Sequence, residues 1–243
     1  MQPSAVTKIE AMLPDDAVVL DIGAWGRPFR RANWVMDAMP YETRGLYGFD
    51  GAGEERFDMD HWIRRDICDR EPFPFADNEI DFVICSHTLE DIRDPVWVCS
   101  EIRRIAKAGY LETPSRYEEQ AAQIQGPWTG WSHHHWLVDV DGNKISFLYK
   151  HNRVHFYESD KFPRDFWVNL APDEKVVSLW WEGTFDVEEK LYTDFDDLHA
   201  DLEDFVTKGL ASHAWRPAPK PPASRVRSSL GHLKRAVTSL RSS

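Results

Sequence analysis

The stretch that decides the fold is AVVLDIGAWG, at residues 17–26. Its first part is a continuous apolar run, which is typical of a parallel strand buried on both faces. The run ends at Asp21, and Gly23 and Gly26 follow, so the backbone can approach a ligand closely at the carboxyl end of the strand. The stretch therefore predicts an open α/β sheet with a binding site at this edge.

Apolar runs further along the chain predict the other strands of this sheet. They fall at 33–37, 80–86 and 109–115, and WIRRDI at 62–67 gives a weaker strand signal. Before the last of them, DPVWVCSEIRRIAKAG predicts an amphipathic helix that Gly109 ends. The gap after the first strand is too short for a full crossover helix. Strands and helices in this order indicate a doubly wound, mostly parallel, Rossmann-like α/β sheet.

After residue 116 the hydrophobic pattern changes to a period of two. WLVDVDGNKISFLYK, at 136–150, alternates around Asp141-Gly142, the strongest hairpin signal in the chain. KVVSLWWEGTFDVEEKLY, at 175–192, indicates a second antiparallel pair that turns at Glu182-Gly183, and residues 194–208 indicate an acidic helix. We therefore expect an inserted β-hairpin or lid at about 126–156 and an antiparallel C-terminal hairpin.

Composition narrows the class of protein. The 243 residues are 42% hydrophobic and 29% charged, which is typical of a globular protein. No apolar run reaches the roughly 18 residues of a membrane span, and the start has no signal-peptide pattern, so we expect a cytoplasmic protein. Cys68, Cys85 and Cys99 are too few and too scattered for a disulfide framework and fit buried, reduced thiols.

The charge is uneven along the chain. The segment from residue 216 holds seven of the 29 basic residues and none of the 41 acidic ones, so the body before it is strongly acidic. An acidic body argues against a nucleic-acid partner, because phosphate binding needs Lys and Arg gathered on the folded surface. We expect one domain at 1–215, then a Pro-rich linker and a basic amphipathic tail helix at 216–243. The sequence leaves three alternatives for this tail: it docks on a partner or on the acidic body, it binds weakly at a membrane surface, or it is disordered.

Three motifs occur in a fixed order after the second strand. They are RDIC at 65–68, PFPFADNEIDFVICSHTLEDIRDP at 72–95 and EIRRIAKAGYLETPSR at 101–116. Together they resemble the class I S-adenosylmethionine-dependent methyltransferases, most closely the type 11 branch. The resemblance covers about residues 17–116 and implies methyl transfer as the activity and S-adenosylmethionine as the cofactor.

The resemblance also implies roles for particular residues. The methionine part of the cofactor would lie against Asp21, Gly23, Ala24 and Gly26. The ribose would lie against Asp37, and the adenine against Asp66 and Ile67. The sulfonium would lie above Ser86 and His87. One departure is GRPFRRA at 26–32, which replaces the first crossover helix and leaves Arg27, Arg30 or Arg31 to contact the cofactor carboxylate.

Histidines are the candidate catalytic residues. Imidazole titrates near neutrality, so a histidine can remove a proton from a hydroxyl or amine acceptor. We rank His87, beside the cofactor, and His135 first, followed by His133 and His134; ordinary packed or solvated histidines are the alternative. On a strand only His133 and His135 would share a face and could hold one ion, and we expect no metal.

The function that these observations predict is an S-adenosylmethionine-dependent methyltransferase acting on a hydroxyl or amine of a small metabolite or glycan. The alternative is a methyltransferase-like domain that binds the cofactor without turnover and serves as a scaffold.

Overall fold

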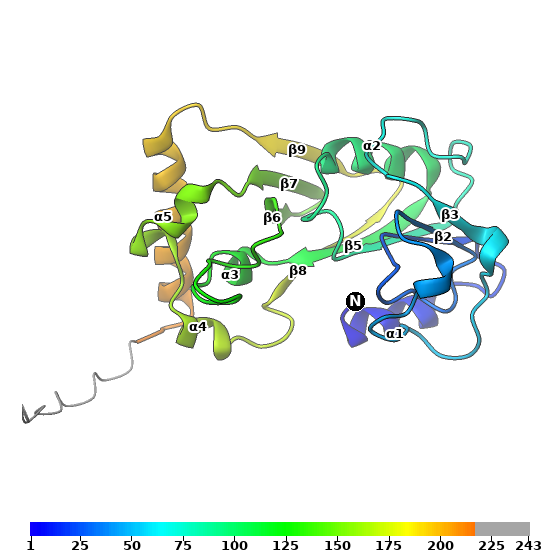
Figure 1. Ribbon diagram of the computed structural model, residues 1–243, viewed down its shortest axis with the longest axis horizontal. Helices are drawn as coiled ribbons and strands as arrows, with labels where there is room; N and C mark the ends of the chain where they lie inside the picture. Colours follow the sequence, from blue (N-terminus) through cyan, green and yellow to red (C-terminus); the bar gives the residue numbers. More distant parts are fainter. Residues whose placement is uncertain (217–243) are drawn as a thin grey trace, which may run out of the picture.

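The computed structural model describes residues 1–216. Its main sheet has six strands in the order β3-β2-β1-β4-β5-β8. The first five are parallel and β8 is antiparallel to β5 (Figure 1). The strands are β1 Val19–Ile22, β2 Trp34–Asp37, β3 Trp62–Arg64, β4 Phe82–Ser86, β5 Ala108–Pro114 and β8 Val176–Glu182. The predicted Rossmann-like class, with a mainly parallel sheet, is confirmed.

Helices cover the two faces of the main sheet sparingly. α1 (Pro3–Met12) packs against one face, where its Ile9 joins Val19 in the core. α2 (Pro95–Ile105) packs against the opposite face, which carries Leu20. The link from β1 to β2 holds no helix, as its length predicted, and the link from β2 to β3 holds only the short turns η1 Tyr41–Thr43 and η2 Met59–His61.

The end of α2 differs from the sequence prediction. The helix starts where the Asp94 carboxylate accepts the Trp97 amide hydrogen bond, 3.1 Å away. It ends at Ile105, with Ala106 already in an extended conformation, so Gly109 does not terminate it. Gly109 instead pairs with Val83 inside the sheet. The helix therefore ends without a glycine cap, and Gly109 belongs to strand β5, which pairs with β4.

A second, three-stranded sheet has the order β6-β7-β9. β6 (Trp136–Asp141) and β7 (Lys144–Tyr149) form the predicted hairpin, with Gly142 at φ +57° in the turn. β9 (Asp186–Lys190) runs parallel to β7 and does not pair with β8. The predicted C-terminal hairpin is therefore wrong in its pairing, because the chain leaves the main sheet after Glu182 and enters the second one. Alternation identifies a strand but not its neighbour.

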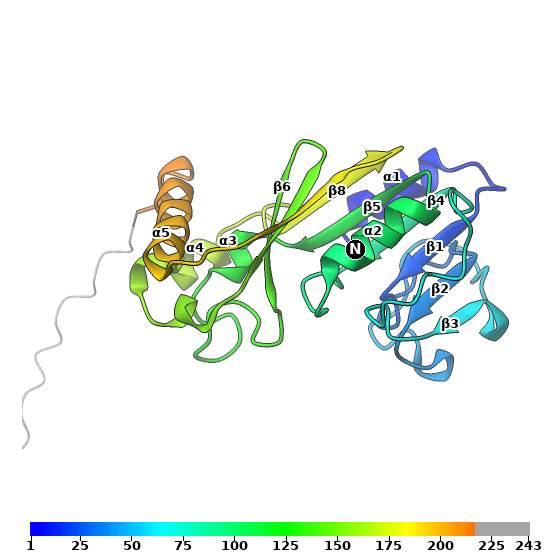
Figure 2. The ribbon, with the colours of Figure 1, turned by 90° about the horizontal axis from the view of Figure 1, so that it is seen from above.

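The remaining helices gather at one end of the molecule. Figure 2 shows α5 far from β1, β2 and β3, with the small sheet between them. The buried Arg116 fastens this end, since its guanidinium lies 3.2 Å from an Asp139 carboxylate oxygen and 2.9 Å from one of Asp201. The short helical elements here are α3 Arg116–Glu119, η3 Asn152–His155, η4 Glu158–Asp160 and α4 Arg164–Val168, and the long one is α5 Phe195–Ser212.

Two further predictions, on the cysteines and on membrane spans, concern residues that the structure describes. The three cysteines are free and buried, as expected. Within this part of the chain, no helix has both the length and the apolar character needed to cross a membrane. The predicted linker and tail helix lie, apart from Arg216, outside the described residues.

Replacing Phe147 tests whether the small sheet shares the core of the main one. Phe147 is fully buried among side chains of the main sheet and α2, whereas Tyr149, on the same strand, is half exposed. We expect Phe147→Ala to lower the free energy of unfolding by about 3–5 kcal/mol in a single transition, and Tyr149→Ala to lower it by much less. Denaturant unfolding followed by circular dichroism measures both. Equal effects, or a separate early transition, would contradict a shared core.

Candidate functional site

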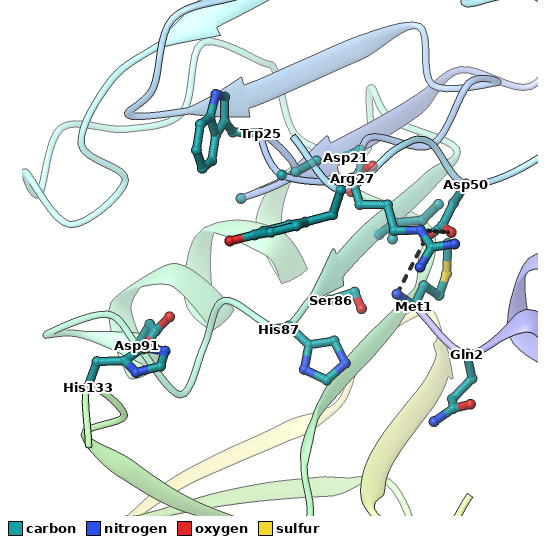
Figure 3. Close-up of a pocket in the computed structure, with 15 residues that line it drawn as sticks. Met1, Gln2, Asp21, Trp25, Arg27, Asp50, Ser86, His87, Asp91 and His133 are labelled. Carbon is teal, nitrogen blue, oxygen red and sulfur yellow. Dashed lines mark ion pairs between the residues drawn. The ribbon is translucent and has the colours of Figure 1, made fainter. Parts of the chain in front are cut away.

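A cavity of about 610 Å³ lies at the carboxyl ends of β1 and β4 (Figure 3). From these neighbouring strands the sheet continues in opposite directions, to β2 on one side and β5 on the other. Such a switch point is where open α/β sheets bind ligands. Five predicted cofactor residues line this cavity: Asp21, Gly23, Ala24, Gly26 and Ser86.

Gly23 shapes the floor of the cavity because no larger residue fits there. Its φ is +70°, and a Cβ atom would lie 2.1 Å from the Thr88 hydroxyl oxygen. Its amide donates a 2.8 Å hydrogen bond to the Met36 carbonyl, which holds the turn against the end of β2. The glycine signal in the sequence thus reflects a close approach between the β1 and β4 loops.

Two buried carboxylates hold the loop that replaces the crossover helix. Asp21 accepts the Phe29 amide at 2.8 Å, and Asp37 accepts the Trp25 amide at 2.9 Å and the Met39 amide at 2.8 Å. Burial raises the pKa of Asp21 to about 7 and also raises the pKa of Asp37. Asp21 and Asp37 therefore hold the backbone of this loop in place, and each also lines a cavity.

A second cavity, of about 200 Å³, adjoins the first. The predicted adenosine residues Asp37, Asp66 and Ile67 line it, and Gly23 lines both cavities. Asp66 forms a 2.7 Å ion pair with Arg93. All eight predicted cofactor residues thus lie along two connected cavities, and their contacts with the cofactor stay predictions.

The predicted arginines separate in the structure. Arg27 lines the first cavity and forms a 2.8 Å ion pair with Asp50. Arg30 stacks over the Phe49 ring, and the Arg31 guanidinium donates to the Pro14 carbonyl, so neither belongs to the cavity lining. Asp50 was missed by sequence reasoning because the segment 38–61 has no periodic pattern that would predict which side chains turn inward.

His87 occupies the centre of the site and lines all three cavities described here. Its Nε2 lies 3.2 Å from Glu112 Oε1, and its Nδ1 lies 3.6 Å from Glu90 Oε1. Burial lowers the pKa of His87, but the hydrogen bond with Glu112 and the negative charges of Glu112 and Glu90 outweigh it and raise the pKa to about 9. His87 is therefore an imidazolium at neutral pH, which disfavours the general-base role considered for it from the sequence.

A third cavity, of about 350 Å³, adjoins the first on the side of the turn that precedes β6. The two cavities share Tyr47, His87, Asp91 and His133. The third is lined by aromatic, acidic and histidine side chains, among them Glu90, Asp91, Glu118, Trp131, His133 and His134. It is thus a space beside the first cavity in which a second ligand could lie.

Glu90 is an unusual member of this lining. Its side chain is 1% exposed, and neither carboxylate oxygen has a hydrogen-bond partner within the described residues. Burial raises the pKa of this carboxyl group. A buried carboxylate without a donor is costly, so a ligand that donates a hydrogen bond to it is favoured. No pattern in the sequence distinguishes Glu90 from a surface glutamate.

The histidine triplet does not form a strand, because β6 begins only at Trp136. In the turn before it, the rings of His133 and His134 lie 4.4 Å apart and both face Asp91. His135 is exposed and lines none of the three cavities. The structure thus brings His87 and His133 to the site and leaves His135 outside. The condition under which His133 and His135 would share a face, a strand running through the triplet, is therefore not met.

Part of the chain matches a known protein family. Residues 51–111 match the family described as methyltransferase domain. No curated protein matches the chain. Among solved structures, the chain is similar to one in the complex between the Haloferax volcanii Trm112 methyltransferase activator and a methyltransferase, with 17% identity, a TM-score of 0.40 and coverage of 73% of this chain and 88% of that one. It is also similar to an S-adenosylmethionine-dependent methyltransferase from Aquifex aeolicus, with 16% identity, a TM-score of 0.32 and coverage of 54% and 82%.

The family match and the sheet agree with each other. The chain has a mixed α/β fold whose mainly parallel sheet carries an antiparallel strand at its edge, which is consistent with a Rossmann-like methyltransferase fold. The match of residues 51–111 to a methyltransferase domain implies S-adenosylmethionine as the cofactor.

Asp37→Ala tests the predicted ribose site. The substitution removes an acceptor of charge-assisted hydrogen bonds, each contributing about 1.5–3 kcal/mol, so we expect affinity for S-adenosylhomocysteine to fall at least about tenfold. Isothermal titration calorimetry measures the change, with Asp60→Ala at an exposed position as the control. Because Asp37 also holds the Trp25 amide, Asp37→Asn and a melting curve separate lost contacts from a displaced loop. Unchanged affinity in a folded Asp37→Ala protein would show that the ribose lies elsewhere.

The charge of His87 should appear in the pH dependence of stability. Its pKa in the folded protein, about 9, lies above the ordinary value near 6.5. The stabilisation from its carboxylate partners is therefore fully present below pH about 6.5 and is lost as the pH rises through about 9. We expect urea unfolding to show a decline between pH 7.5 and 9.5 that His87→Asn abolishes and His61→Asn leaves intact. A wild-type curve that is flat over this interval would contradict the ion pair.

Proposed function

We propose that the chain transfers the methyl group of S-adenosylmethionine to a hydroxyl group of a small, polyhydroxylated acceptor, such as a sugar unit of a glycan. The observation that carries this proposal is the junction of the first and third cavities at His87 and Asp91. The first cavity is the predicted place of the methionine part of the cofactor. An acceptor in the third cavity would therefore face the methyl group.

The lining of the third cavity supports a sugar-like acceptor. Trp131 offers an aromatic face, and its indole nitrogen is fixed by a 2.7 Å hydrogen bond to the Glu118 carboxylate. Glu90, Asp91 and Glu118 bring carboxylates that accept hydrogen bonds from hydroxyl groups. An amine is the competing acceptor, because the same carboxylates attract a cation.

The reaction proposed is a direct displacement. The acceptor oxygen forms a bond to the methyl carbon while the bond from that carbon to sulfur breaks, and S-adenosylhomocysteine leaves. The hydroxyl proton passes to Glu90, whose oxygens accept no hydrogen bond within residues 1–216 and whose Oε1 lies 3.6 Å from the His87 imidazolium. Holding the two reactants in line supplies most of the acceleration. His87 with Glu90 and Glu112 carries one positive and two negative charges, a balance that favours a cationic sulfonium nearby.

An acceptor screen tests the function. The protein is incubated with S-adenosylmethionine and a panel of glycosides and small amines, and release of S-adenosylhomocysteine is followed together with a 14 Da increase in acceptor mass. We expect turnover with glycosides bearing free hydroxyl groups. Turnover with amines alone would overturn the choice of acceptor. Cofactor binding without turnover on any acceptor would favour the non-catalytic scaffold.

Glu90→Gln tests the proton acceptor. The amide keeps the shape of the side chain and cannot take the proton, so we expect kcat to fall by about 10²–10⁴ with little change in cofactor affinity. Glu42→Gln, at an exposed position that lines none of the three cavities, is the matched control. A Glu90→Gln protein that is folded and retains full kcat would exclude this role.

A further inference from the structure

The strongest cluster of possible metal ligands lies between the first and third cavities. It consists of Asp91, His133 and His134, whose candidate ligand atoms all lie within 4.8 Å of one another. His133 Nε2 lies 4.0 Å and His134 Nε2 lies 3.7 Å from the same oxygen of Asp91. Figure 3 shows Asp91 and His133 facing each other at one end of the first cavity.

We propose that Asp91, His133 and His134 form a binding site for one divalent transition-metal ion of the zinc type. Zinc binds histidine nitrogen and carboxylate oxygen at about 2.0–2.2 Å, which places tetrahedral ligands about 3.3 Å apart. The distances to Asp91 exceed this separation by less than one ångström. Small side-chain movements in an exposed turn would therefore close the ligands around an ion.

The other ring nitrogen of His134 provides independent support for this site. His134 Nδ1 lies 2.7 Å from Glu119 Oε1, and the side chains of both residues are buried. Glu119 is itself held by Lys150, whose ammonium lies 2.6 Å from Glu119 Oε2 and 2.8 Å from the Trp131 carbonyl oxygen. A carboxylate that binds the far nitrogen of a histidine fixes the ring and directs the other nitrogen outward, which is the usual arrangement behind metal-binding histidines.

The surroundings also favour a cation. Glu90 and Glu118 line the same cavity as the three ligands, and the Glu90 carboxylate has no hydrogen-bond partner among the described residues. Three protein ligands leave at least one position open, as in catalytic zinc sites. That open position would lie on the path between the two cavities, where a bound ion lowers the pKa of an oxygen that it contacts.

Metal binding can be measured without cofactor or acceptor, so this test is independent of the proposed methyl transfer. The chelator-treated protein is titrated with ZnCl₂ by isothermal titration calorimetry and with CoCl₂ by visible absorption. We expect one ion per chain. His133→Ala, at an exposed position, and the isosteric Asp91→Asn should each weaken zinc binding by more than about 100-fold, beyond the roughly 10–100-fold cost of outer-shell changes.

His135→Ala is the matched control, because it removes an exposed histidine from the same triplet without touching the cluster. We expect it to bind zinc and cobalt as the wild type does. Absence of saturable binding of one ion by the wild type would overturn the proposal. A His135→Ala protein that loses as much zinc affinity as His133→Ala would also overturn it. The ligands would then be His133 and His135, as a strand would place them.

Discussion

The site depends on how the loop after β1 is held. In place of a crossover helix, the chain runs through 23–33 without regular structure, and buried carboxylates supply the order that a helix would give. Asp21 and Asp37 accept backbone amides of this loop, and Gly23 lies so close to Thr88 that no side chain fits between them. These contacts fix the floor of two connected cavities at the switch point of the sheet. The raised pKa of Asp21, about 7, reflects the burial that this arrangement requires.

Charge organises the region beyond this loop. His87 lies between Glu90 and Glu112 and is positively charged at neutral pH, since its pKa is about 9. The third cavity adds Asp91 and Glu118, so carboxylates outnumber cations around it. Acidic surroundings of this kind suit a cationic sulfonium on one side, and on the other they support the metal ion that we propose.

The sequence was sufficient to predict the main sheet and the cofactor side of the site. Four of the five parallel strands gave an apolar run and β3 gave a weaker signal, and the glycines and aspartates at strand ends must meet at one edge of a parallel sheet. The pairing of β8 and β9 could not be predicted, because alternation does not reveal which sheet a strand joins. His133 and His134 were misassigned for a related reason: the turn before β6 gives neighbouring side chains a common direction, whereas a strand would oppose them. Glu90 and Asp50 carried no local signal, since only tertiary packing buries them.

The central claim is that the two connected cavities hold S-adenosylmethionine, with its sulfur toward the junction of the first and third cavities. A crystal structure with S-adenosylhomocysteine bound tests this most directly. The account predicts adenosine between Asp37 and Ile67, the amino-acid part beside Gly23, and the sulfur facing His87 and Asp91. Cofactor bound outside these cavities, or with its sulfur turned away from the third cavity, would contradict it.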